Sequence, residues 1–261
     1  MKKVIVIIGI LLWTINLKAQ VGGISASKLT TICTETVSAN NIEFEPSFYF
    51  NSSSMAWNDA GKKQSIFSDA DSSQIKSGFA FRFSYGLTKN LETGVTVSNN
   101  MAMANWGFKY HFFNKKKTSL ALIGGINTPL GNRTTDKNNK STENVLAGGL
   151  VITHHFSEKF GMDADIQYQR HLFEQAGHHH QDFFFNTDLG YYIIDKIQLV
   201  SGFNFSSTDG NITQYQLTFN PGITVEKADN FILVMQFPYT VLGKNTYQSF
   251  GFGMALTIMI D

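Results

Sequence analysis

The eight-residue stretch Met162–Gln169 alternates apolar and polar side chains without a break. A period of two is the period of a β-strand, so the apolar side chains leave one face and the polar side chains leave the other. The polar face carries two carboxylates and two amides, and the apolar face ends in Tyr168. The same alternation recurs along the chain, and it restricts the fold to strands with one apolar and one polar face.

Twelve segments of this kind are predicted, which is an even number. They are residues 42–50, 79–85, 91–97, 102–112, 120–126, 146–156, 162–169, 183–193, 199–205, 215–225, 231–237 and 250–260. The connections after even-numbered segments are short turns, whereas those after odd-numbered segments include long polar loops at 51–76, 129–143 and 172–181. Outer-membrane barrels have short periplasmic turns and longer outer loops. A soluble secreted sandwich, the main alternative, gives no reason for this division.

The composition agrees with strands in a membrane. The 261-residue chain has 23 Phe against 4 Pro, which suits strands and works against disorder. Its mean hydropathy of −0.10 is too polar for a helical membrane protein. The formal net charge of +1 gives no basic surface that calls for nucleic acid. We therefore predict an all-β fold, an antiparallel up-and-down transmembrane β-barrel of about twelve strands.

The first residues are typical of a signal peptide, predicted to span residues 1–19. Lys2 and Lys3 form a positive start, residues 4–17 are apolar, and Ala19-Gln20 is a plausible cleavage neighbourhood. The apolar run is too short and wrongly flanked for a spanning helix, although a retained anchor helix is the alternative. Secretion behind such a signal places the barrel in the outer membrane of a Gram-negative cell.

Residues 20–40 are small and polar without a period, and they are predicted to be a periplasmic lead-in to the barrel domain, residues 41–261. Cys33 is the one cysteine, so no intrachain disulfide is possible, and we interpret it as an incidental thiol. The parity of the connections predicts that both termini are periplasmic. Outer-membrane lipid and the barrel-assembly machinery are the expected partners, with no nucleic acid.

Three segments resemble a known family. The segment 78–95, with the run Tyr85-Gly86-Leu87-Thr88-Lys89-Asn90-Leu91-Glu92-Thr93-Gly94-Val95, is similar to the pattern RYGLTDNLEVGV of the outer-membrane proteins named for the MetA-pathway of phenol degradation. Residues 36–45 resemble that family's opening strand, and residues 237–245 with the closing strand resemble its C-terminal end. The resemblance implies passage of small, hydrophobic or aromatic compounds. One departure is the ending Met259-Ile260-Asp261, where such barrels commonly end on an aromatic residue.

Ten polar side chains are predicted to face the lumen by their parity. They are Glu43, Glu45, Arg82, Lys109, His111, Asp163, Asp165, Gln167, Asp188 and Gln216. Two interpretations remain open: they pair with one another and fill the barrel, because buried charges must be paired, or they line a narrow polar channel. Asp163 and Asp165 are expected to find Arg82, Lys109 or water as partners.

Histidines raise two further hypotheses. A barrel that hydrolyses lipids would need a Ser and a His within hydrogen-bond reach, and His154, His155 and His171 lie near strand ends without a serine fixed beside them or a Gly-x-Ser-x-Gly motif. The run His178-His179-His180 could bind a transition metal, although a solvated loop tip explains it better. We predict no enzyme, no cofactor and no metal site.

The predicted function is therefore a barrel that admits small molecules by passive diffusion. The solute is unknown, and the family resemblance makes it hydrophobic or aromatic. A non-conducting structural or surface-interaction barrel is the alternative, and an outer-membrane lipid hydrolase is the remote one.

Overall fold

The computed structural model describes residues 21–26, 30–68, 72–98, 103–130, 144–172, 181–209, 212–228 and 230–260. The predicted signal peptide lies outside these residues. One antiparallel sheet contains all fourteen strands found in the described ranges. The strands are β1 (Ile42–Trp57), β2 (Lys63–Ser65), β3 (Gln74–Thr88), β4 (Leu91–Ser98), β5 (Met103–Lys115), β6 (Thr118–Pro129), β7 (Val145–His155), β8 (Phe160–His171), β9 (Gln181–Ile194), β10 (Ile197–Asp209), β11 (Gln214–Ala228), β12 (Phe231–Gln236), β13 (Tyr239–Lys244) and β14 (Thr246–Ile260).

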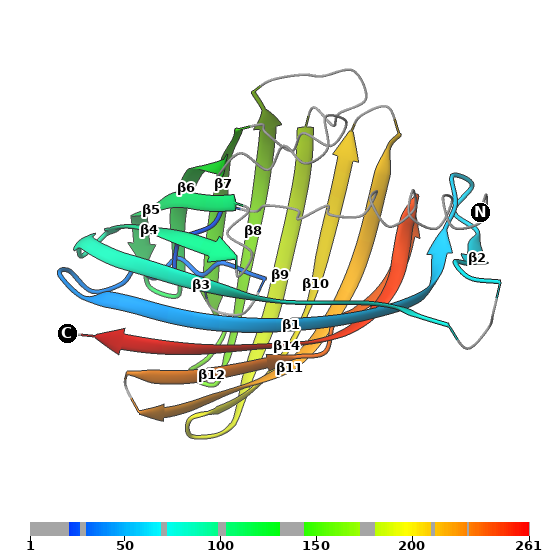
Figure 1. Ribbon diagram of the computed structural model, residues 1–261. Coiled ribbons are helices and arrows are strands. Elements are labelled where there is room, and N and C mark those ends of the chain that lie inside the picture. The colour runs from blue at the N-terminus through cyan, green and yellow to red at the C-terminus, as the bar shows by residue number, and fades with distance from the viewer. Residues whose placement is uncertain are drawn as a thin grey trace.

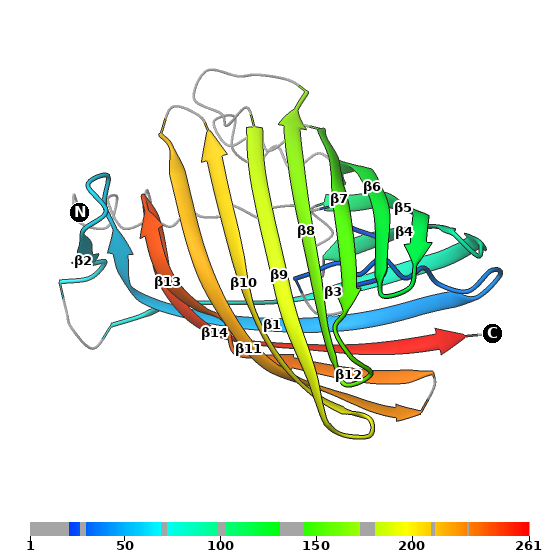
Figure 2. The same ribbon diagram turned by 180° about the vertical axis from the view of Figure 1, so that it is seen from behind.

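The sheet closes on itself because the first and last strands pair along their whole length, from Ile42 opposite Ile260 to Trp57 opposite Thr246. Figures 1 and 2 show β1 and β14 side by side at this seam. β12 and β13 occupy one position between β11 and β14, interrupted at Phe237-Pro238, and β2 pairs with β1 beyond the end of the barrel wall. The barrel is thus a closed antiparallel barrel of twelve strands, which confirms the predicted fold class.

Each strand has the two faces that the alternation predicts. On β8 the side chain of Ile166 is 43% exposed on the outside, whereas its neighbour Asp165 is 2% exposed and faces the lumen. The exposed large apolar side chains of the other strands, such as Phe81, Trp106 and Phe203, likewise lie on the outer face. This apolar belt is the surface that a lipid bilayer covers. Among the described residues, no helix is long and apolar enough to cross a membrane.

Two predicted loops are shorter than expected. β1 continues through Trp57 and β3 begins at Gln74, so the predicted loop 51–76 contains strand at both ends. Likewise, β13 and the first residues of β14 fall between the predicted segments 231–237 and 250–260. The turn between β13 and β14 is therefore Asn245 alone, which has a left-handed φ of 50°. The polar sequence was misleading because pairing with a neighbouring strand satisfies the backbone whatever the side chain.

The two ends of the barrel differ as predicted from parity. At one end, five short turns join β3 to β4, β5 to β6, β7 to β8, β9 to β10 and β11 to β12. The paired strand ends Ile42 and Ile260 lie at this short-turn end. The connections at the opposite end include the predicted loops 129–143 and 172–181, which fall mostly outside the described residues.

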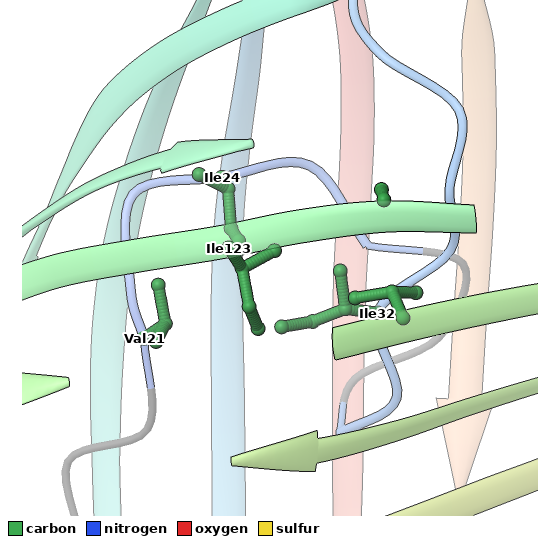
Figure 3. Close-up of a cluster of buried hydrophobic side chains, with 6 residues drawn as sticks. Val21, Ile24, Ile32 and Ile123 are labelled. Carbon is green, nitrogen blue, oxygen red and sulfur yellow. The ribbon is translucent and has the colours of Figure 1, made fainter. Parts of the chain in front are cut away.

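The segment before β1 lies inside the barrel, which differs from the predicted periplasmic lead-in. We call its described residues, 21–26 and 30–40, the plug segment. Val21, Ile24 and Ile32 are buried and pack on Ile123 and other lumen-facing side chains of β6 and β7 (Figure 3). Among the described plug residues, backbone pairing with the sheet is limited to one isolated β-bridge, between Ala39 and Gly86. Burial of these apolar side chains is what keeps the segment in the lumen.

Glycines on the wall make room for this segment. A Cβ atom at Gly94 or Gly107 would overlap the backbone carbonyl oxygens of Gly23 and Gly22, respectively. The same would happen at Gly86 with the carbonyl oxygens of residues 37 and 38. The plug backbone therefore lies directly against the inner surface of β3, β4 and β5, where any larger residue would displace it.

Candidate functional site

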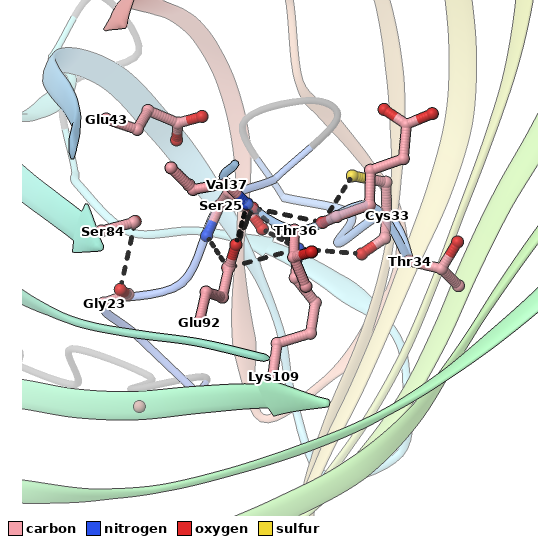
Figure 4. A network of polar contacts seen from close by, with 12 residues as sticks. Gly23, Ser25, Cys33, Thr34, Thr36, Val37, Glu43, Ser84, Glu92 and Lys109 are labelled. Atoms are coloured by element: carbon pink, nitrogen blue, oxygen red, sulfur yellow. Dashed lines mark hydrogen bonds and ion pairs between the residues drawn. The ribbon is translucent and has the colours of Figure 1, made fainter. Parts of the chain in front are cut away.

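A buried ion pair lies at the centre of the contact between wall and plug segment. Glu92 of β4 and Lys109 of β5 are opposite each other in the sheet, and both are 0% exposed. The Lys109 Nζ atom lies 3.4 Å from Glu92 Oε1 and donates to the carbonyl oxygens of Ser25, at 3.0 Å, and Cys33, at 3.1 Å (Figure 4). Lys109 thus holds two points of the plug segment at once.

Glu92 completes this network from the acceptor side. Its carboxylate accepts hydrogen bonds from the backbone N–H of Ser25, at 2.6 Å, and from that of Val37, at 2.7 Å. The Ser25 hydroxyl also contacts both carboxylate oxygens (Figure 4). A fully buried charge is tolerated only with such partners, so the pair and the plug segment depend on each other.

Asp165 and Gln167 hold a second part of the plug segment from β8. The Asp165 carboxylate accepts hydrogen bonds from the backbone N–H of Ile32, at 3.0 Å, and from the side-chain amides of Gln167 and Asn186. Gln167 in turn accepts one from the backbone N–H of Val21, at 2.9 Å. We expected Asp165 to pair with Arg82 or Lys109. Water was the third expected partner. In the structure the carboxylate instead accepts hydrogen bonds from one plug amide, the Ile32 N–H, and from two wall side chains.

Arg82 belongs to a separate cluster. Its guanidinium lies 2.8 Å from Glu43 and 2.6 Å from Glu45, two lumen-facing carboxylates of the adjacent strand β1. Glu45 also accepts a hydrogen bond from Thr257 of β14, at 2.7 Å. This cluster therefore bridges the inner surface across the seam that closes the barrel.

The four remaining predicted lumen residues are spread over the wall. Asp163 accepts a hydrogen bond from Thr153, at 2.6 Å, and Asp188 is fully buried opposite it on β9. Gln216 accepts one from Thr246 near the opposite end. His111 lies beside a strand irregularity at the short-turn end and contacts the Phe113 carbonyl oxygen. A direct role in solute passage stays a prediction for all ten residues.

The interior has two unlike surfaces. We call Glu92, Lys109, Asp163, Asp165 and Asp188, on β4, β5, β8 and β9, the charged wall. The neutral wall comprises buried, uncharged polar side chains of β11 to β14, namely Asn220, Thr224, Gln236, Thr240 and Thr257. Within the described chain, Asn220 Nδ2, Thr224 Oγ1 and Gln236 Nε2 have no hydrogen-bond partner. Such buried polar atoms call for water or a bound molecule.

The histidine hypotheses find little in the described residues. His154 contacts the Thr118 hydroxyl at 2.8 Å, and His171 lies 3.4 Å from Asp182. No group of side chains suited to a metal ion occurs among the residues that the structure describes. The run His178-His179-His180 lies outside them.

Sequence reasoning missed Glu92 and the plug segment. Glu92 lies at a lumen-facing position of β4, so the same parity that selected Lys109 could have found it. The plug segment has no period, and its partners are distant in sequence: 67 positions separate Ser25 from Glu92. No local pattern signals such a contact.

Solved structures support the architecture. An outer membrane channel from Pseudomonas putida F1, described as COG4313, matches with a TM-score of 0.70 and 13% identity, covering 87% of this chain and 98% of that one. The NanC porin matches with 0.53 and 5% identity over 83% and 98% of the two chains. The KdgM porin in complex with oligogalacturonate gives 0.50 and 8% over 85% and 99%.

At these identities the likeness concerns the fold alone, and no curated protein matches the sequence. A family model, in contrast, matches residues 101–256, which is more than half of the chain, and it is described as "Putative MetA-pathway of phenol degradation". The predicted family is thereby confirmed, and the chain belongs to it.

Proposed function

We propose that this protein is an outer-membrane diffusion channel for small hydrophobic or aromatic molecules, and that the plug segment closes its lumen at rest. The observation that carries the proposal is the way the plug segment is held. Hydrogen bonds to side chains and a small apolar cluster fix it, whereas strand pairing is limited to a single bridge. A segment held in this way can leave the wall without opening the sheet.

The solute class rests on the family, whose description refers to phenol degradation. The passage itself fits the neutral wall, where the partnerless polar atoms of Asn220 and Gln236 face the lumen away from the charged wall. A wall without charges suits an uncharged solute, because no ion must be desolvated or displaced as the solute passes. The channel description of the Pseudomonas putida structure agrees with this role and with a non-enzymatic one.

The proposed orientation follows from the two ends of the barrel. Short turns occupy the end where β1 begins and β14 finishes, and short turns are periplasmic in barrels of this kind. Both ends of the barrel sequence then face the periplasm, and the loop after β1 faces outward. Insertion by the barrel-assembly machinery stays a prediction.

The experiment compares wild-type protein with Gly107→Ala, a single change that displaces the plug segment. The three atoms nearest to the new methyl group all belong to the plug segment: it would overlap the Gly22 carbonyl oxygen and press tightly on the Ile24 side chain. Phenol uptake into liposomes and conductance in planar bilayers are measured. Because the plug segment closes the wild-type lumen and leaves the wall only transiently, we expect slow phenol uptake by the wild type. The variant should show a clearly higher rate and a larger conductance.

The matched control is Gly148→Ala, because the nearest atom to its new methyl group, the Ile123 carbonyl oxygen, lies 3.7 Å away in ordinary contact. This control should behave as wild type. Absence of phenol uptake in all three proteins would overturn the channel and favour the non-conducting structural barrel.

A further inference from the structure

The lipid-facing surface contains an apolar hollow near the short-turn end. Its volume is about 380 Å³, and it lies over β9, β10 and β11 with an edge from β8. The side chains that surround it include Phe160, Leu189, Tyr191, Leu199, Ser201 and Pro221. Leu189, Tyr191 and Leu199 are all exposed on the outside of the barrel, so the hollow opens toward the bilayer.

The hollow arises from small residues between large ones. Along the outer face of β10, Ser201 stands between Leu199 and Phe203. The residue opposite Ser201 on β11 is Pro221, whose compact ring also leaves space and whose nitrogen cannot donate to the ladder. A gap in an otherwise bulky belt thus results from two small residues, Ser201 and Pro221, at paired positions.

Two lysines stand above this hollow at the membrane boundary. Lys159 directly precedes Phe160, and Lys196 lies three residues before Leu199 in the turn between β9 and β10. Both side chains are exposed, and neither takes part in an ion pair within the described chain, although Glu158 and Asp195 are their sequence neighbours. Their two turns adjoin, since the Tyr192 N–H donates to the Lys159 carbonyl oxygen at 2.9 Å.

We propose that the hollow and the two lysines bind one anionic glycerophospholipid. The ammonium groups of Lys159 and Lys196 contact its phosphate, and an acyl chain fills the hollow. The spacing fits, because Leu199 and Ser201 lie three and five residues from Lys196, roughly 10 Å and 17 Å along a strand at about 3.4 Å per residue. In a lipid, too, the phosphate lies at the membrane surface and the acyl chain lies deeper, in the same order as the lysines and the hollow.

Charge and shape together select this ligand over the lipids around it. A zwitterionic lipid offers the same acyl chain without net negative charge, and free phosphate offers the charge without the chain. With the short-turn end periplasmic, as proposed above, the site faces the leaflet of phospholipids. The site does not depend on whether the lumen conducts.

The test is native mass spectrometry of the purified barrel in mild detergent, titrated with phosphatidylglycerol or phosphatidylcholine. We expect wild-type protein to retain one phosphatidylglycerol about tenfold more tightly than phosphatidylcholine, and excess inorganic phosphate not to displace it. Lys159→Gln/Lys196→Gln should remove the preference for the anionic lipid. Ser201→Leu, which fills the hollow from a lipid-facing position, should weaken the binding of both lipids.

The matched control is Lys115→Gln/Lys116→Gln, which removes the same charge from the end of β5 and its turn to β6. It leaves Lys117 in place, because the Nζ atom of Lys117 donates to the Phe156 carbonyl oxygen in the turn that carries Lys159. It should bind as wild type. Equal retention of both lipids by wild type, equal loss in the control pair, or full retention by a correctly folded Ser201→Leu would each overturn the proposal. Heat-modifiable migration in gels shows whether each variant is folded.

Discussion

The charged wall and the neutral wall enclose one lumen, but their buried polar side chains differ in their hydrogen-bond partners. On the charged wall, Glu92 and Asp165 accept hydrogen bonds from plug backbone, and Lys109 donates to it. On the neutral wall, Asn220 and Gln236 are equally buried, yet each has a side-chain nitrogen without a partner among the described residues. The contrast indicates that Glu92, Lys109 and Asp165 hold the plug segment, whereas the neutral wall is the side that the proposed solute passage would use.

The largest effect is expected from Glu92→Gln, which leaves the Lys109 ammonium buried without its counter-ion. Breaking one partner of a buried pair costs about 3–5 kcal/mol, so the plugged state should be destabilised by that order. Cys33 reports the change, since it lies in the plug segment and is the one cysteine. A bulky maleimide reagent should label Cys33 faster in the variant.

The control for this prediction is the double variant Glu92→Gln/Lys109→Gln, which removes both charges. It should recover part of the slow labelling of the wild type. If Glu92→Gln labels as slowly as wild type, the charged wall does not hold the plug segment.

The next largest effect tests the inside and outside of the charged wall. Ile166→Arg places a charge in the apolar belt beside Asp165 and should cost about 2–4 kcal/mol if it lies near the bilayer midplane. Asp165→Asn keeps the volume and one acceptor for the Ile32 N–H, so it should be milder. Urea unfolding in vesicles measures both, and equal tolerance would contradict the assignment of faces.

A matched pair of substitutions compares the two walls directly. Gln167→Leu removes the acceptor of the Val21 N–H and a donor to Asp165, and it should cost about 1–3 kcal/mol. Gln236→Leu removes an amide whose nitrogen has no described partner, so its effect should be near zero. The same unfolding measurement applies, and similar losses at both positions would break the distinction between the walls.

The smallest effect concerns a charge outside the lumen. Asp59, in the loop after β1, has its pKa held below the ordinary 3.8 by hydrogen bonds from Asn245 and Lys244 and by the lysine charge. A carboxylate with a lowered pKa stabilises the fold above its unfolded pKa, and this is lost as the pH falls through the folded value. Melting temperatures below pH 4 should therefore fall slightly, and Asp59→Asn should flatten this dependence.

The barrel was predictable because its signal is local. In Met162–Gln169 the alternation predicts the face of each side chain, and the pairing of β8 with β7 and β9 agrees with that prediction. Loop boundaries were less predictable: Ser52 and Ser53 look like loop in the sequence but pair with β3.

The contents of the lumen were only partly predictable. The alternation correctly predicted that Lys109 and Asp165 face the lumen, but it does not identify their hydrogen-bond partners. Val21 meets Gln167 across 146 positions, and the residues between them carry no trace of that contact. The plug segment has few apolar residues, and their burial is visible only once the wall that covers them exists.

The closing seam sets an order of events. Ile42 must find Ile260 at the far end of the chain, and contacts between such distant residues form slowly because the loop entropy is lost first. The plug segment instead contacts mainly β3 to β8, which are neighbouring strands joined by hairpin connections and can pair early. Its docking can thus precede closure, so that the unfinished sheet wraps around a segment already in place and no chain needs to be threaded through a completed ring.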